Sequence, residues 1–465
     1  MKLYRNAIIL LVIVALLVGV YFLIRSKKPD DLPTQPDEYE SLTDYTSDQI
    51  ESVTLENSDG TFIIIKKDND WALSAPTDLK YDPSALSSIV INSASIIADK
   101  VVEEDPQDLS IYGLDDPAIA RVEVKDGTVT TIEIGDKTPT KGGYYVKVAG
   151  TSKVYVISSF TGDKLVTGRN GMRIKQLFDF TADKIDSLAM NRRGESVFAS
   201  AMDKESGSWS MISPIKGSVN ETAFAPMLEA LTNTMILEFI EDKPADLSLY
   251  GLDKPAYEFV FNAEGAGEIK LQMGTEMKKG SSIYAKLDGN DEVFTIDMTP
   301  YTFLDKPLKE IINVFAYIVN IDQVKKIDLT MDGKTTNMTL DVYKDAEGNS
   351  DNDKDKFYVN GIDASGKDEK DDQPFRKFYQ ALIGVCIDEI DLEGKPEVSA
   401  DITIDYTLKD GTMRVEYISK DENFYYVVRN GEYAGVLVKK RNKTDFGIDG
   451  MKQAYDTMMT FLAEQ

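Results

Sequence analysis

An eleven-residue stretch that occurs twice determines how the sequence is organised. It reads Asp-Leu-Ser-Ile-Tyr-Gly-Leu-Asp-Asp-Pro-Ala at Asp108–Ala118 and Asp-Leu-Ser-Leu-Tyr-Gly-Leu-Asp-Lys-Pro-Ala at Asp246–Ala256, an offset of 138 residues. Nine of the eleven positions are identical. The same offset relates Trp71 to Trp209, the two tryptophans of the protein. A match of this kind indicates an internal duplication, so we predict tandem copies of one structural unit.

Weaker matches extend the two copies and indicate a third. Upstream of the tryptophans, the spacing of Tyr45 and Ile50 parallels that of Phe180 and Ile185, so each copy begins well before its tryptophan. A third, diverged copy has Phe357 in the place of the tryptophan and lacks Tyr-Gly-Leu-Asp. We therefore expect two to three repeats, with boundaries at 41–170, 171–310 and 311–443, followed by a C-terminal helix at 444–465.

Each copy contains the same series of local signals. A hairpin comes first, as at 52–66 around Asp59-Gly60, because glycine allows the positive φ of a tight turn. A helix follows, which Asp82 can cap and Pro83 can start in the first copy. Its expected apolar face in the three copies is Leu86, Ile89, Val90 and Ile97; Phe224, Met227, Leu228 and Leu231 after a cap at Asn220; and Phe375, Phe378, Tyr379, Leu382 and Cys386 after Asp372 and Pro374.

Four short alternating strands complete each copy. They are clearest in the third copy, at 398–408, 412–419, 423–429 and 434–440. Connecting segments at 172–180, 307–319 and 451–462 have helical periodicity. The predicted fold class is therefore α+β, with mostly antiparallel sheet and one covering helix in each repeat.

The repeated signature invites two interpretations, a ligand pocket or a packed corner. Tyr and Leu side chains would be buried, Gly would adopt a backbone conformation that other residues resist, and Pro would precede the next strand. Such residues supply neither a nucleophile nor a base, so we favour the structural interpretation. The signature residues are Trp71, Tyr112, Gly113, Leu114, Asp115 and Pro117 in the first copy and Trp209, Tyr250, Gly251, Leu252, Asp253 and Pro255 in the second.

The composition excludes most catalytic and metal-binding constellations. The chain has no histidine and a single cysteine, Cys386, so it cannot build Ser-His-Asp or Cys-His sites, common zinc sites or an intrachain disulfide. Gly333-Lys334-Thr335 lacks the leading glycine of a phosphate-binding loop, because Asp328 stands there. The acidic segment 345–356 lacks the glycine and glutamate of a calcium loop and reads as a mobile hairpin tip. We expect no enzyme activity, no metal and no cofactor, although a carboxylate-pair hydrolase stays open.

The N-terminus is predicted to anchor the protein in a membrane. The run Ala7–Ile24 contains 18 residues without a charge, close to the minimum length that spans a bilayer core. A cleaved signal peptide is the competing interpretation, but the run ends in Tyr-Phe-Leu-Ile-Arg without a small-residue cleavage site. We therefore expect a signal-anchor at 1–28, with contact to the membrane through 7–24. Prolines and acids at 29–40 indicate an extended stalk.

Charge separates the anchor from the rest of the chain. The protein carries 52 Lys and Arg against 79 Asp and Glu, a net charge of −27. Five of the basic residues and none of the acids lie in 1–28, so the remainder has a net charge of −32. This polyanionic body disfavours binding to nucleic acid or to anionic lipid. Basic residues flank both ends of the apolar run, and we expect the large body outside the cytoplasm because long domains translocate largely regardless of charge.

The anchor, the Trp-x-x-x-x-Pro elements at Trp71–Pro76 and Trp209–Pro214, and the repeated signature resemble the bacterial membrane-anchored domain-of-unknown-function family 4340. The likeness covers nearly all of residues 41–300 and, more weakly, the third copy, and its Gly-Leu-Asp-x-Pro runs stand at Gly113–Pro117 and Gly251–Pro255. Members are often encoded beside ABC-transporter permeases, so the resemblance implies a permease or auxiliary protein as partner. The family has no agreed catalytic residues, so the resemblance implies no site.

These observations lead to one expected function and one alternative. We expect a single-pass, extracytoplasmic, non-catalytic repeat protein of the bacterial cytoplasmic membrane that serves as an accessory or scaffold to an ABC-type transport complex. The alternative is an envelope-associated protein that binds a polymer, or hydrolyses it with carboxylates.

Overall fold

The computed structural model describes residues 39–278, 280–441 and 447–464. The chain divides between Lys175 and Gln176 into two compact units. Across the described residues, no helix has both the length and the apolarity that a membrane crossing requires. The predicted anchor, residues 1–28, and all but the last two residues of the predicted stalk lie outside the described part of the chain.

The first unit is built around one nine-stranded antiparallel sheet in the order β1-β5-β9-β8-β7-β6-β2-β3-β4. Strands such as β2 alternate buried and accessible residues, because one face of the sheet packs on the core and the other meets solvent. The strands are β1 (Ser41–Asp44), β2 (Ile50–Asn57), β3 (Gly60–Lys67), β4 (Asp70–Ala75), β5 (Ser95–Glu103), β6 (Ala118–Val124), β7 (Val129–Lys137), β8 (Gly143–Val148) and β9 (Val154–Ser158).

Helix α2 (Pro83–Ala94) links β4 at one edge of this sheet to β5 near the other. The backbone N–H of Ser84 donates to Oδ1 of Asp82 (2.8 Å), and Pro83 occupies the first turn, so both predicted start signals are confirmed. Leu86, Ile89 and Val90 are buried by the sheet, as predicted. The unit also has two short helices, α3 (Ser159–Leu165) and α4 (Arg169–Met172).

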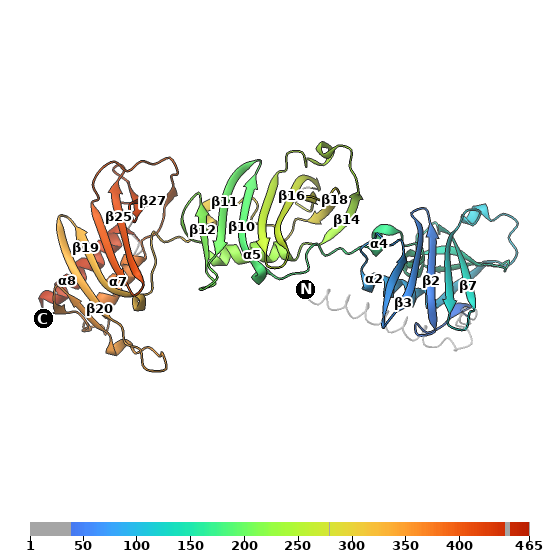
Figure 1. The fold of residues 1–465 in the computed structure, drawn as a ribbon, viewed down its shortest axis with the longest axis horizontal. Coiled ribbons are helices and arrows are strands. Elements are labelled where there is room, and N and C mark those ends of the chain that lie inside the picture. Colours follow the sequence, from blue (N-terminus) through green and yellow to red (C-terminus); the bar gives the residue numbers. More distant parts are fainter. Residues whose placement is uncertain (1–38, 279, 442–446, 465) are drawn as a thin grey trace, which may run out of the picture. The chain divides into compact units, whose positions relative to one another are not determined.

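The second unit begins with another nine-stranded antiparallel sheet, in the order β13-β12-β11-β10-β15-β16-β17-β18-β14. Helix α5 (Glu221–Thr232) lies along it (Figure 1) and buries Phe224, Met227 and Leu231. The strands are β10 (Ile185–Arg192), β11 (Glu195–Met202), β12 (Trp209–Ser213), β13 (Gly217–Ser218), β14 (Ile236–Glu241), β15 (Tyr257–Ala263), β16 (Gly267–Lys278), β17 (Ser282–Leu287) and β18 (Val293–Asp297), and a short helix α6 (Leu308–Ile311) follows.

A third nine-stranded antiparallel sheet completes the second unit, in the order β22-β21-β20-β19-β24-β25-β26-β27-β23. Helices α7 (Pro374–Ile383) and α8 (Ile448–Ala463) pack against each other beside this sheet (Figure 1). The strands are β19 (Val324–Met331), β20 (Lys334–Asp341), β21 (Lys356–Val359), β22 (Ile362–Asp363), β23 (Glu389–Ile390), β24 (Ile402–Leu408), β25 (Gly411–Ser419), β26 (Phe424–Arg429) and β27 (Glu432–Lys439).

The three sheets share one arrangement for eight of their nine strands, which confirms the predicted architecture of mostly antiparallel sheet with a covering helix. In each, a set of three strands (β2–β4, β10–β12 or β19–β21) precedes the helix, and one strand that pairs with the last strand and a four-stranded meander follow it. The ninth strand differs, because β1 pairs with β5 in the first sheet, whereas β13 and β22 pair with β12 and β21. The first strand of each set pairs with the first strand of the meander, and buried residues meet there. The pairs are Val53 with Val122, Met190 with Phe259, and Leu329 with Ile404.

Several local predictions are wrong, because tertiary pairing overrides local periodicity. Ile97 does not belong to the helical face: α2 ends at Ala94, and Ile97 lies in β5 with 51% of its surface exposed. Helix α4 ends at Met172, because the Met172 carbonyl accepts from the N–H of Asp82 and the chain then continues extended. Residues 312–319 are also non-helical, with bridges from Ile312 to Val219 and from Phe315 to Cys386.

Candidate interaction sites

The repeated signature forms a turn between the strand that follows the covering helix and the first strand of the meander. Each copy contains one turn of 3-10 helix, Ser110–Tyr112 in the first sheet and Leu247–Tyr250 in the second. The carboxylates of Asp108 and Asp246 stabilise the start of these turns, because each accepts a 2.9 Å hydrogen bond from the backbone N–H two residues later.

The signature tyrosines attach this turn to the sheet. The ring of Tyr112 packs on Tyr145 and that of Tyr250 on Tyr284, each with 5.0 Å between centroids. The Tyr112 hydroxyl donates to Glu103 (2.6 Å). The Tyr250 hydroxyl donates to Glu241 (2.7 Å) in the same way. Because each carboxylate favours the protonated phenol, the pKa of both tyrosines is raised.

Two pairs of glycines let the turn approach the sheet closely. Gly113 and Gly251 both have φ of +67°, the left-handed region that favours glycine. Opposite them lie Gly135 and Gly274, where a Cβ atom would stand 2.1 Å from the carbonyl oxygen of Tyr112 or of Tyr250. Only glycine fits at these two positions. The 139-residue spacing of Gly135 and Gly274 is visible in the sequence, but their role depends on the fold.

The other signature residues divide into buried and exposed groups. Leu114 and Leu252 are buried, and in the first unit Leu114 forms a small separate core with Tyr112 and Val154. The tryptophans line the main cores, Trp71 buried and Trp209 half-buried. Pro117 and Pro255 stand just before β6 and β15, and the carboxylates of Asp115 and Asp253 are exposed.

One of the two positions that differ between the signatures, Ile111 in the first copy and Leu249 in the second, is not explained by packing. Ile111 is 64% exposed and Leu249 is 72% exposed, at equivalent positions of the two turns. The carboxylate of Asp108 or Asp246, the left-handed glycine and the stacked tyrosine hold each turn in place. Each turn therefore presents one large apolar side chain to solvent. The sequence did not predict this exposure, since an Ile or Leu in an apolar motif is usually buried.

The third sheet has a shortened version of the signature turn. Asp391-Leu392-Glu393-Gly394 follows β23, and a Cβ on Gly394 would approach the ring pair of Tyr426 and Tyr433, whose centroids are 5.2 Å apart. Leu392, two residues before the glycine as in the other signatures, is 49% exposed. The tyrosine of the signature is therefore replaced here by a ring pair within the β26–β27 hairpin.

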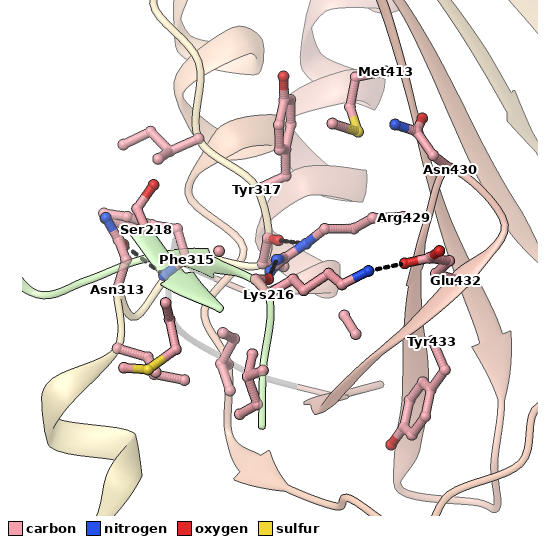
Figure 2. Close-up of a pocket in the computed structure, with 18 of the residues that line it drawn as sticks. Lys216, Ser218, Asn313, Phe315, Tyr317, Met413, Arg429, Asn430, Glu432 and Tyr433 are labelled. Atoms are coloured by element: carbon pink, nitrogen blue, oxygen red, sulfur yellow. Dashed lines mark hydrogen bonds and ion pairs between the residues drawn. The ribbon is translucent and has the colours of Figure 1, made fainter. Parts of the chain in front are cut away.

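A cavity of about 600 Å³ lies in the second unit (Figure 2). Three segments supply most of its lining: β12 with the loop that joins it to β13, the non-helical segment after α6, and the β26–β27 hairpin. Its polar groups include Lys216, Asn313, Arg429 and Glu432. Lys216 and Glu432 form a 2.8 Å ion pair, and the nearby ammonium lowers the pKa of Glu432. Sequence reasoning did not find this cavity, because residues about 100 and 200 positions apart build it.

The structure also shows the burial of two other features that the sequence singled out, Cys386 and the acidic segment 345–356. Cys386 is half-buried, lies after α7 rather than on it, and has a raised thiol pKa chiefly because of burial. The acidic segment 345–356 is not wholly a solvated tip, because Asp355 is buried (1% exposed) and paired with Arg376. Within the described residues, no group of three or more Asp, Glu or Cys side chains is placed to hold a metal ion.

The fold and these sites define a tandem-repeat α+β protein. A family model described as "Domain of unknown function (DUF4340)" matches residues 71–255 and again 209–374, so the two matches together span well over half of the chain. The chain belongs to this family, as the resemblance indicated. Both matches begin at a tryptophan, and the first ends at the second signature, so the family unit is longer than one repeat. Comparisons with curated proteins and with solved structures gave no match.

Proposed function

We propose that this protein works by contact, as a membrane-anchored, extracytoplasmic accessory or scaffold component of an ABC-type transport complex. The observation that carries the proposal is the repeated turn that holds Ile111 and Leu249 outward at equivalent positions. A single exposed apolar side chain costs little free energy, and isolated apolar side chains are normal on protein surfaces. A rigid turn that presents one at the same place in two repeats is instead suited to bind a partner twice.

Burial of these two side chains suits a protein partner. Covering one Ile or Leu side chain contributes about 1.5–3 kcal/mol, and because each turn is already ordered, little conformational entropy is lost on contact. Two such contacts in one chain strengthen each other through their high effective concentration. A repeated contact surface fits a scaffold better than an enzyme, which needs one asymmetric active site.

Charge supports a protein partner over a lipid surface. The chain beyond the predicted anchor has a net charge of −32, which disfavours contact with anionic lipid. The acidic, proline-containing stretch at 29–40 would hold the body away from the bilayer. The signature turns would then meet the extracytoplasmic part of a membrane protein.

The transport complex as partner rests on the family resemblance, whose members are often encoded beside ABC-transporter permeases. No phosphate-binding loop occurs in the sequence. Any energy for transport would therefore come from the partner rather than from this chain.

Purification of the full chain from its own membranes in mild detergent tests the proposal. A permease that stays bound in stoichiometric amounts would support it. The decisive variant is the double substitution Ile111→Ser and Leu249→Ser, which should release the permease without changing the unfolding midpoint, because both residues are exposed. A bound glycan and no permease would favour the alternative, an envelope polymer-binding protein, and would contradict the proposal.

A further inference from the structure

Arg429 stands where the two other sheets have an aliphatic residue. In the third sheet it is the register partner of Val415 across the β25–β26 hairpin. At the equivalent pairs, Ile132 faces Val148 in the first sheet and Leu271 faces Leu287 in the second. The fold itself therefore requires only a hydrophobic side chain at this position, and the charge of Arg429 serves another purpose.

The guanidinium group of Arg429 is held by neutral oxygens. Its Nε donates to the carbonyl of Ala316 (2.8 Å) and its Nη1 to the carbonyl of Lys216 (2.7 Å). Among the described residues, no carboxylate forms an ion pair with it and no hydrogen bond uses Nη2. Burial lowers the pKa of this guanidinium, since its charge is partly removed from water without a compensating anion. Arg429 keeps its positive charge nonetheless, because arginine is not deprotonated in proteins.

This uncompensated cation lines the 600 Å³ cavity (Figure 2). The other cation there, Lys216, is neutralised by Glu432 at 2.8 Å, so the local charge balance is about one positive charge. The amide groups of Asn313 and Asn430 add neutral hydrogen-bonding partners. Figure 2 shows the guanidinium reaching toward the backbone of Lys216, whose own side chain runs the other way to Glu432.

The remaining walls are mostly apolar. They are formed by Met211, Ile212, Pro214, Ile215, Phe315, Tyr317 and Met413. A cavity of a few hundred cubic ångströms with apolar walls and a few placed polar groups is typical of a small-molecule site. One planar guanidinium with free N–H groups matches a carboxylate, which carries a single charge and accepts two parallel hydrogen bonds. A phosphate dianion would need a second uncompensated cation, which the described residues do not supply.

We propose that this cavity binds a small amphipathic carboxylate, with the anionic group on Arg429 and the apolar body against Met211, Ile215 and Phe315. The site is separate from the signature turns and does not depend on the proposed function. The chain would then bind a small ligand in addition to contacting a partner through its signature turns.

Titration calorimetry on the full chain in lipid nanodiscs tests the proposal with hexanoate as the probe. Hexanamide has nearly the same shape without charge, and hexylammonium reverses the charge, so both are matched control ligands. Hexanoate should bind at least about tenfold more tightly than either, as expected for a charge-assisted pair in a partly buried site. Equal binding of hexanoate and hexanamide, or binding of neither, would overturn the proposal.

Two variants separate ligand binding from a purely structural role of Arg429. Arg429→Leu reproduces the residue of the second sheet at this register and should reduce hexanoate affinity at least about tenfold. That change also leaves the Ala316 and Lys216 carbonyls without their donor. Glu432→Gln is therefore the second variant: it keeps those hydrogen bonds, removes one negative charge from the cavity, and should tighten hexanoate binding roughly threefold or more. Unchanged or weaker binding by Glu432→Gln would mean that Arg429 only holds the two carbonyls.

Discussion

Gly135 provides a sharp test of how the signature turn is held. In Gly135→Ala the new Cβ would lie 2.1 Å from the carbonyl oxygen of Tyr112, whereas carbon and oxygen normally stay about 3.3 Å or more apart. The turn would have to move by about 1.2 Å, which breaks the ring contact of Tyr112 with Tyr145 and its hydrogen bond to Glu103. Overpacking against a backbone atom costs about 2–3 kcal/mol.

Urea unfolding of the full chain in detergent measures this cost. In a Trp209→Phe background Trp71, which is buried in the first unit, is the only tryptophan and reports on that unit alone. With a slope of about 2–3 kcal/mol per molar urea, the midpoint should fall by about 1 M. Gly142→Ala is the matched control, because its Cβ would meet nothing closer than 3.7 Å. Equal midpoints for Gly135→Ala and Gly142→Ala would refute the close approach of turn and strand.

Three further predictions concern stability and pH. Arg376→Met should destabilise the third sheet by about 3 kcal/mol, because it leaves the buried Asp355 carboxylate without its cation; thermal unfolding measures this, and a loss below about 1 kcal/mol would contradict it. The pKa of Tyr155 is raised to about 12, first by burial and then by its hydrogen bond to Glu40; its contribution to stability should be complete below pH 10 and lost between pH 10 and 12, and Tyr155→Phe should flatten that part of the stability curve. Lys216→Ala should change the unfolding midpoint little, because both partners of its ion pair with Glu432 are largely exposed; a loss above about 1 kcal/mol would show that the pair stabilises the unit.

The sequence predicts the repeated architecture because local and long-range signals agree there. Asp82 and Pro83 start α2 where the pattern places it, and the alternation of the third copy gives four strands that the structure confirms with ends shifted by up to four residues. The wrong predictions concern residues that pair with a segment distant in the sequence. Ile97 continues a helical period, yet it pairs with Ser41 in the sheet, and Phe315 pairs with Cys386 instead of extending a helix.

The candidate sites were harder to predict from the sequence than the fold was. The signature was visible, but a motif does not reveal that Tyr112 is buried while Ile111 beside it is exposed. Arg429 carries no local signal, since its meaning comes from register partners and from carbonyl groups 113 and 213 residues away. Residue spacing can locate a turn, whereas an uncompensated charge becomes visible only once the neighbours are in place.

Site-specific photo-crosslinking in living cells tests the central claim most directly. A benzophenone side chain would replace Ile111, Leu249 or Val129, the last being 54% exposed but without an apolar counterpart in the second repeat. Positions 111 and 249 should both crosslink to the same integral membrane transport protein, and position 129 should not. Absence of a crosslink at 111 and 249, or equal crosslinking at all three positions, would contradict the role of the signature turns as partner contacts.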